Sequence, residues 1–271
     1  MSRFDGRVCI VTGSTGMAAS AARALAAEGA DVFVTSLTAD HARALADELG
    51  AGDGDVAWRA ADLTQEAEAE AAVAACVERF GRIDALYDVV GISGRRFGDG
   101  PLHEATLTGW ETVMTANVTS LFLVARATVR QMLTQDPDAD GSRGVLLTMS
   151  SALARHPSPA HFATHAYAAS KGAIEAFTRA VAAYYAPSGI RANAIAPSLV
   201  ATPMSRRAQD DPVVGAYLRW KQPLANGPIE ADAITPVALH LLSRESRMIT
   251  GQVIDVDAGW GVSEPPQPPS A

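Results

Sequence analysis

Tyr167 and Lys171, in the run Tyr-Ala-Ala-Ser-Lys, have the types and spacing of a proton-transfer pair. The stretch 165–185 has no proline and repeats apolar residues at helical spacing, which predicts a helix. Residues four apart share a helix face, so the ammonium would lie one turn from the phenol. At roughly 4 Å and an effective dielectric near 20, that charge favours the phenolate by about 4 kcal/mol. This equals about three pKa units, enough for a tyrosine general acid or base near neutral pH.

Because a core tyrosine beside a solvated lysine has the same pattern, the elements around the pair decide between the two interpretations. Short apolar runs predict strands at 8–11, 31–35, 56–60, 83–90, 145–149, 191–195 and 252–257. Helical patterns cover 18–28, 39–49, 65–80, 108–133, 165–185 and 232–242. Successive strand–helix units with short loops predict a parallel sheet covered on both faces, a doubly wound Rossmann fold of about seven strands.

We expect one domain over 1–262, since the length and the 48% hydrophobic content allow one large core. The segment 202–228 is broken by prolines, which predicts an irregular cover over a substrate site. The proline-rich stretch 263–271 is expected to be a disordered tail.

Charge and hydropathy bear on which partners and which cellular location the protein has. A net charge of −8 without a basic run argues against a nucleic-acid partner. We find no apolar run near the ~18 residues of a membrane span and no signal-peptide core at the start, so a cytoplasmic protein is expected. Cys9 and Cys76 lack metal or redox spacing, so both are expected to be buried thiols.

The turn after the first expected strand, Thr-Gly-Ser-Thr-Gly-Met, is placed to hold a phosphate. Backbone N–H groups at the start of a helix, with the helix dipole, bind a pyrophosphate at this position of a Rossmann sheet. We expect Gly13 to allow the tight turn, Gly16 to let the backbone approach the ligand, and Ser14 and Met17 to contact it. Two glycines also fit an ordinary turn, but the first strand–helix junction favours a dinucleotide.

The ends of the next two strands bear on the choice of nucleotide. An acid normally holds the free ribose of NAD at the end of the second strand, where this chain has Ser36. The missing acid favours NADP, with NAD left open. Asp62 ends the third strand, where it could bond an adenine amino group or remain a solvated aspartate.

In this order and setting, the motifs resemble those of the short-chain dehydrogenase/reductase family over residues 6–260. The matching residues are Thr12-Gly13, Asp62, Asn117, Ser150-Ser151, Tyr167 to Lys171, Asn193 to Pro197 with Thr202 to Met204, and Thr250 to Asp257.

The resemblance implies a catalytic role for each of four residues. Tyr167 would exchange a proton with the substrate oxygen, and Lys171 would lower the tyrosine pKa and hold the nicotinamide ribose. Ser151 would orient the carbonyl, and Asn117 would hold a water that links Lys171 to solvent. A strand-end cap for Ser151 and a polar kink for Asn117 are the structural alternatives. The family also places further residues along the nucleotide, here Leu63, Gly91, Pro197, Val200 and Thr202.

The chain departs from the family pattern at three places. The phosphate turn is one residue shorter. Asp88-Val-Val-Gly91 stands where Asn-Asn-Ala-Gly is usual. Ser151 lies sixteen residues before Tyr167, a few more than usual, so Ser150 is the fallback. The extra residues fall beside the pocket and would shape it.

The expected function is an NAD(P)-dependent oxidoreductase that interconverts a secondary alcohol and a ketone. A non-catalytic dinucleotide-binding sensor is the alternative, which has no need of a proton donor. An enoyl reductase is disfavoured, because such relatives usually separate tyrosine and lysine further.

His161 and His165 lack a third ligand for zinc, so we expect no metal and read them as histidines that line the pocket. The apolar surface of 108–133 and 165–185 predicts a homo-oligomer, a tetramer or dimer.

Overall fold

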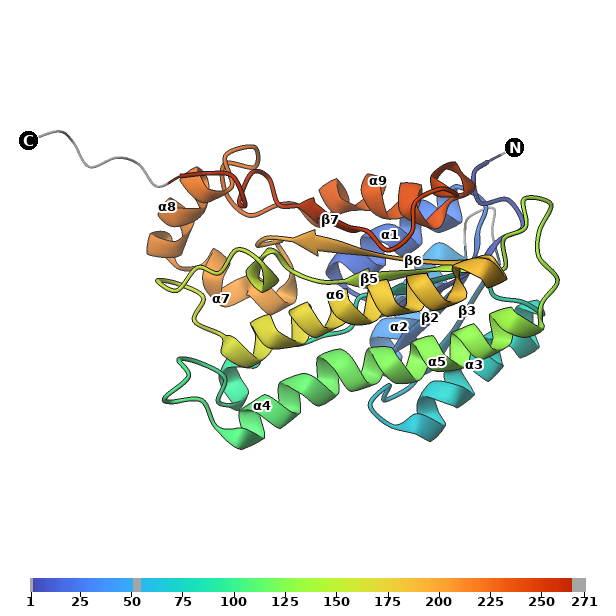
Figure 1. Ribbon diagram of the computed structural model, residues 1–271, viewed down its shortest axis with the longest axis horizontal. Helices are drawn as coiled ribbons and strands as arrows, with labels where there is room; N and C mark the ends of the chain where they lie inside the picture. Colours follow the sequence, from blue (N-terminus) through green and yellow to red (C-terminus); the bar gives the residue numbers. More distant parts are fainter. Residues whose placement is uncertain (1, 51–54, 265–271) are drawn as a thin grey trace, which may run out of the picture.

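A seven-stranded parallel sheet forms the centre of the protein in the computed structural model, which describes residues 2–50 and 55–264 (Figure 1). The strands lie in the order β3-β2-β1-β4-β5-β6-β7. Their bounds are β1 Val8–Thr12, β2 Asp31–Ser36, β3 Val56–Ala60, β4 Ala85–Asp88, β5 Gly144–Met149, β6 Ile190–Pro197 and β7 Val253–Val256. The order reverses direction between β1 and β4. The predicted doubly wound fold is therefore confirmed.

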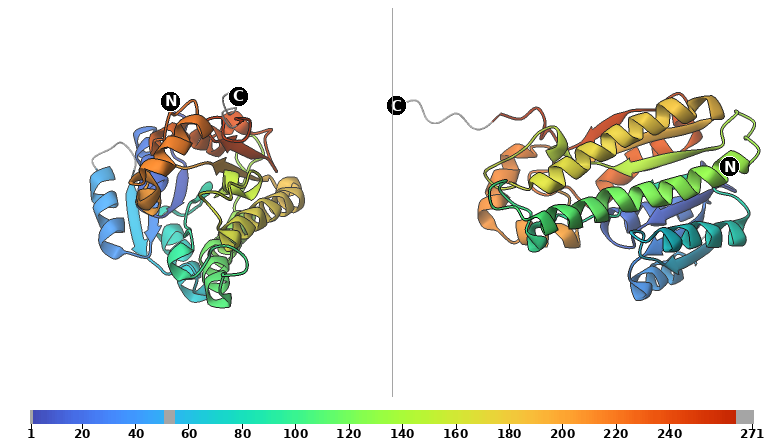
Figure 2. Two further views of the ribbon diagram at one scale, coloured as in Figure 1. Left: turned by 90° about the vertical axis from the view of Figure 1, so that its left-hand side faces the viewer. Right: turned by 60° about the horizontal axis from the view of Figure 1, so that its bottom comes forward.

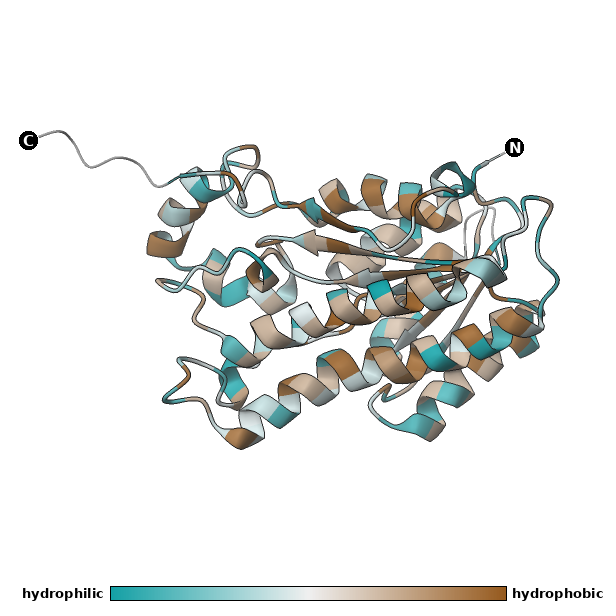
Figure 3. Cartoon of the chain, viewed as in Figure 1, coloured by the Kyte–Doolittle hydropathy of each residue, from teal (hydrophilic) through white to brown (hydrophobic). Residues whose placement is uncertain are grey.

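Two helical layers cover the sheet. One core cluster joins the sheet to α1 (Gly16–Ala27), α2 (Ala39–Leu49) and α9 (Ala231–Leu242). The other joins it to α3 (Glu66–Phe80), α5 (Ser120–Thr134) and α6 (His165–Tyr185). Successive β1 residues alternate between the two clusters, so a strand buried on both faces is apolar throughout. Figure 2 shows the two layers from the end and from below, and Figure 3 shows the apolar strands between them.

The predicted helix 108–133 is interrupted. It consists of α4 (Leu107–Met114), a π-helical turn at Thr115–Thr119 and α5. The side chain of Thr106 accepts from the Gly109 N–H and caps α4, so the helix starts one residue earlier than expected. The π turn contains Asn117, and such turns often mark functional sites.

The segment 202–228, expected to be irregular, contains α7 (Arg206–Gln209) and α8 (Pro212–Lys221). Its prolines do not break these helices, because Pro212 is the first residue of α8, where the missing N–H costs no hydrogen bond. The Asp211 carboxylate caps the same end by accepting from two backbone N–H groups. Both helices lie beyond the carboxyl ends of the strands, at the left in Figure 1.

At the C-terminal side the packed chain extends past the predicted end at residue 262. Ser263 donates its hydroxyl to the Lys221 carbonyl (3.0 Å), and its own carbonyl accepts from the Lys221 ammonium (3.2 Å). The rest of the predicted tail, 265–271, lies outside the described residues.

Within the described residues, one helical stretch has the length and composition of a membrane span, contrary to our expectation. It is Leu107–Thr134, of 28 residues, and 56% of its most apolar window is buried inside the protein. Because α5 contributes to a core cluster, this stretch is a flanking helix of the sheet.

Candidate active site

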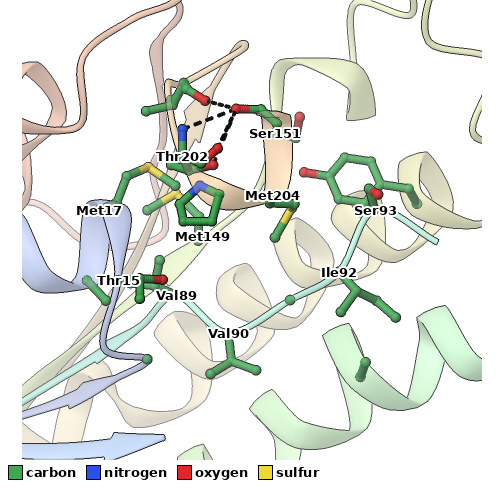
Figure 4. A pocket seen from close by; sticks show the side chains of 18 of the residues that line it. Thr15, Met17, Val89, Val90, Ile92, Ser93, Met149, Ser151, Thr202 and Met204 are labelled. Carbon is green, nitrogen blue, oxygen red and sulfur yellow. Dashed lines mark hydrogen bonds between the residues drawn. The ribbon is translucent and has the colours of Figure 1, made fainter. Parts of the chain in front are cut away.

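A cleft of about 660 Å³ opens at the carboxyl ends of the strands, where the strand order reverses. Ligands of open α/β sheets bind at this position, and the volume suits a sizeable organic ligand. Figure 4 shows Thr15 and Met17 on one side of the cleft and Ser93 and Ser151 on the other. The sequence-predicted residues that line it are Gly13, Ser14, Met17, Ser36, Asp62, Leu63, Gly91, Ser151, Tyr167, Lys171, Pro197, Val200 and Thr202.

The turn between β1 and α1 fits a phosphate group. Gly13 has a positive φ of 94°, which a residue with a side chain rarely adopts, and its N–H is held by the Thr35 carbonyl (2.7 Å). Thr15, at the start of α1, makes no side-chain cap bond, so the first N–H groups of the helix stay available to an anion. Ser14 bonds the Ser36 hydroxyl (3.0 Å), which ties the turn to the end of β2.

Gly16 does not line the cleft in the described part of the chain, contrary to expectation. Its φ is 54°, and a Cβ there would lie 2.9 Å from Cγ2 of Thr202. The glycine is therefore needed for close packing against Thr202, which does line the cleft.

The ends of β2 and β3 form the far part of the cleft. One carboxylate oxygen of Asp62 accepts from the N–H (3.0 Å) and the hydroxyl (2.7 Å) of Thr64. His41, which our sequence reading did not single out, also lines this part. These contacts do not distinguish NADP from NAD, so the preference for NADP stays a prediction.

Tyr167 lies in the first turn of α6, which a buried carboxylate holds. The two oxygens of Asp99 accept from the N–H groups of Ala166 (3.0 Å) and Tyr167 (2.9 Å). Burial raises the pKa of the Tyr167 phenol, and a hydrogen bond with Ser151 opposes this rise. Since Tyr167 and Ser151 both line the cleft, a ligand oxygen could reach both hydroxyls.

Ser151 caps a strand end, as the structural alternative expected, and also lines the cleft. Its oxygen accepts from the Leu153 N–H (3.2 Å) and caps a 3-10 turn at Ala152–Ala154, so its hydroxyl hydrogen is left for Tyr167 or a ligand oxygen in the cleft. The neighbouring Ser150 turns its hydroxyl to the Lys171 carbonyl (3.2 Å) and to the Glu175 carboxylate (3.0 Å). Ser151, rather than its fallback, is the free donor in the cleft.

Lys171 is 3% exposed, and its ammonium donates to the Met149 carbonyl (2.7 Å). The nitrogen lies 5.7 Å from the centre of the Tyr167 ring. Burial lowers the lysine pKa to about 8, and the charge of Asp88 opposes this. The predicted fall in the Tyr167 pKa is absent from this structure, because burial outweighs the hydrogen bond that favours the phenolate.

Asp88 is a buried acid that we noted only as a departure from the family pattern. It is 2% exposed at the end of β4 and accepts from the Thr12 hydroxyl (2.7 Å). Burial raises its pKa to about 6, while the bond from Thr12 and the charge of Lys171 lower it. A carboxylate here and an ammonium on α6 therefore form a coupled buried pair.

Asn117 is fully buried and, within the described residues, not part of the cleft wall. Its amide oxygen accepts from the Ile92 N–H (2.7 Å), and its nitrogen donates to the Ile92 carbonyl (3.1 Å) and the Ser170 hydroxyl (2.9 Å). Both amide hydrogens are thus used to join the π turn, the segment after β4 and α6. The expected water would have to use the remaining lone pair or the backbone.

In the part of the chain that the structure describes, His161 and His165 do not line the cleft, which corrects our interpretation of them. The His165 ring bonds the Gly100 carbonyl (2.8 Å), and the His161 ring packs 4.5 Å from that of Tyr217. No group of three potential metal ligands occurs among the described residues. The segment 202–228 was expected to cover the substrate, and Met204 from it lines the cleft. Tyr217 and Trp220 pack against each other (ring centroids 5.0 Å apart) and do not belong to the described cleft wall.

Three arginines that no sequence motif pointed to also line the cleft: Arg95, Arg96 and Arg207. Two follow β4 in a 3-10 turn at Arg95–Phe97, and Arg207 belongs to α7. Their separation along the chain hides the cluster from any local pattern.

Comparison with known proteins identifies the family of the chain. A family model described as "Enoyl-(Acyl carrier protein) reductase" matches residues 11–261. The chain is 32% identical to D-threitol dehydrogenase of Mycolicibacterium smegmatis, over 96% of this chain and 95% of that protein. It is 33% identical to 3-alpha-(or 20-beta)-hydroxysteroid dehydrogenase of Mycobacterium bovis, over 95% and 90%. A short-chain type dehydrogenase/reductase from Mycobacterium ulcerans has a TM-score of 0.87 at 26% identity, over 98% and 94%. The chain is therefore an enzyme of the short-chain dehydrogenase/reductase family.

Proposed function

We propose that this enzyme interconverts a secondary alcohol and a ketone with NAD(P). The observation that carries the proposal is that Ser151, Tyr167 and Lys171 line the same cleft as the glycine turn at Gly13. Relatives named for the dehydrogenation of a sugar alcohol and a hydroxysteroid support an alcohol or ketone substrate. A bound nicotinamide would supply or accept the hydride.

Tyr167 acts as the general acid in the direction of ketone reduction. Its raised pKa keeps the phenol protonated at neutral pH, so a proton is available to the developing alkoxide. Ser151 donates a hydrogen bond to the carbonyl oxygen and, once Tyr167 has transferred its proton, can donate one to the phenolate, while its own proton stays on the serine oxygen. Lys171 stabilises the phenolate by its charge and holds the nicotinamide ribose. Asn117 supports this arrangement by its hydrogen bond to Ser170, which precedes Lys171. We also propose that Asn117 holds the water that links Lys171 to solvent, as the family resemblance implies.

A screen of secondary alcohols and ketones with both nicotinamides, followed by nicotinamide absorbance, tests the proposal. We expect turnover of at least one ketone. An enoyl thioester belongs in the same screen, because the matching family model is described as an enoyl reductase. Reduction of the carbon–carbon double bond with no ketone turned over would refute the proposal.

We infer a preference for NADP over NAD, since Ser36 offers no carboxylate to repel a 2′-phosphate. Isothermal titration should show tighter binding of NADPH than of NADH. Tighter NADH would reverse the preference. As a control, Ser36→Asp should shift the preference toward NADH.

We further infer a cytoplasmic homo-oligomer, a tetramer or dimer. Large apolar side chains stand exposed on the flanking helices, which favours a partner surface. They are Leu107, Trp110, Phe122, Leu133 and Tyr184. Light scattering should give a mass above 28.2 kDa, and a monomer would contradict the inference.

A further inference from the structure

The arginines of the cleft lie at the reacting end rather than at the nucleotide turn. Arg95 donates to the His161 carbonyl (2.6 Å), in the loop that leads into α6. It is also within electrostatic range of Asp99, whose carboxylate holds the N–H of Tyr167. Arg207 of α7 lines the same cleft as Arg95 and Tyr167, and its charge acts on Arg95.

These positive charges lack carboxylate partners in the described part of the chain. No salt bridge there includes Arg95, Arg96 or Arg207. The neighbouring Asp99 has both oxygens bonded to backbone N–H groups. Partial burial and the charge of Arg207 lower the pKa of Arg95, and Asp99 opposes them. Two guanidinium groups that repel each other at a cleft mouth are stabilised by a bound anion.

The arginines on the cleft wall stand out because the protein as a whole is negatively charged. The whole chain has a net charge of −8, so its general field repels anions. A local group of arginines on the cleft wall reverses that sign where a substrate would enter. Arginine also suits planar anions, because its fork matches both oxygens of a carboxylate or phosphate.

We infer that the ketone or alcohol substrate carries an anionic group, a carboxylate or phosphate, that Arg95 and Arg207 bind beside the reacting carbon. The inference rests on the proposed function, in that the anion and the reacting oxygen belong to one molecule. Arg96, whose guanidinium lies over the Phe97 ring (4.8 Å), adds positive charge at the edge.

Matched substrates test the inference: levulinate against its methyl ester, and dihydroxyacetone phosphate against dihydroxyacetone. We expect the anionic member of at least one pair to have a kcat/KM about 10-fold or more higher, mainly through KM. The preferred pair identifies the group as carboxylate or phosphate. The preference should also weaken as ionic strength rises.

Single-charge variants locate the effect. Arg207→Gln and Arg95→Gln should each remove most of the preference, whereas Arg206→Gln, a neighbouring exposed arginine outside the cleft wall, should keep it. Arg95→Lys retains the positive charge and should therefore show part of the preference for the anionic substrate. Unchanged thermal midpoints would exclude misfolding as the cause.

Three results would overturn the inference: equal kcat/KM within both pairs, a preference that survives both glutamine variants, or a loss of nicotinamide affinity instead. Titration of the same pairs into the nicotinamide complex gives a readout independent of turnover. Tighter, arginine-dependent binding of the anion without any turnover would reject the proposed function and leave the anion site standing.

Discussion

Replacing Asp88 by asparagine should move the pH dependence of catalysis, because this carboxylate helps to keep Lys171 charged. Burial lowers the lysine pKa from 10.5 to about 8, which is about 3 kcal/mol against the ammonium. Asp88 opposes that loss by its charge. Without it, the lysine pKa should fall below 8 by about one unit or more.

The direction of the effect follows from the proposed role of the ammonium. If catalysis needs charged Lys171, the rate falls as pH rises through the lysine pKa. The alkaline limb of kcat/KM should therefore lie near pH 8 in the parent enzyme and at lower pH in Asp88→Asn. The raised pKa of Asp88, about 6, also means that the parent loses stability as pH rises from 3.8 toward 6. Asp88→Asn should not show this loss of stability as the pH rises.

Rates measured between about pH 5 and pH 10 would show the alkaline limb of the parent and of Asp88→Asn, and NMR of labelled lysine would report the Lys171 pKa directly. Asp84→Asn is the control, since it removes a buried acid just before β4 that does not perturb Lys171. An alkaline limb and a lysine pKa that stay in place in Asp88→Asn would refute the reasoning.

Two further substitutions test how the site is positioned. Asp99→Asn should weaken the two bonds to the start of α6, lowering the free energy of unfolding by about 1–2 kcal/mol and the turnover through Tyr167; denaturant titration showing no loss would contradict this. Gly16→Ala should cost about 1–3 kcal/mol, since its φ is 54° and the new Cβ would meet Thr202. Gly172→Ala, in a helix with open space around it, should instead be neutral or stabilising, and an equal loss in both variants would sink the packing argument.

The features that local chemistry determines could be predicted from the sequence. Apolar runs such as those of β1 and β5 indicate strands buried on both faces, and both strands are buried throughout. The Tyr167–Lys171 spacing is local to one helix, so both side chains were placed in the cleft correctly. The prolines of 202–228 led to the wrong expectation of an irregular segment, because proline is also favourable at the first position of a helix.

The remaining features depend on long-range packing, which no local pattern contains. Asp99 and Tyr167 are 68 positions apart, yet the carboxylate holds the helix start that presents the phenol. Arg95 and Arg207 line the same cleft only after the sheet has formed. The pKa of Tyr167 depends on burial as well as on its neighbour four residues away, which is why helix geometry alone gave the wrong direction.

The most direct test of the account is the proton transfer assigned to Tyr167. In Tyr167→Phe we predict a fall in kcat of about 10²–10⁴-fold or more with any ketone that the parent reduces, and nicotinamide affinity within a few-fold of the parent. Tyr184→Phe, an exposed tyrosine on the same helix, serves as the control and should keep full activity. Parent-like turnover in Tyr167→Phe would contradict the account.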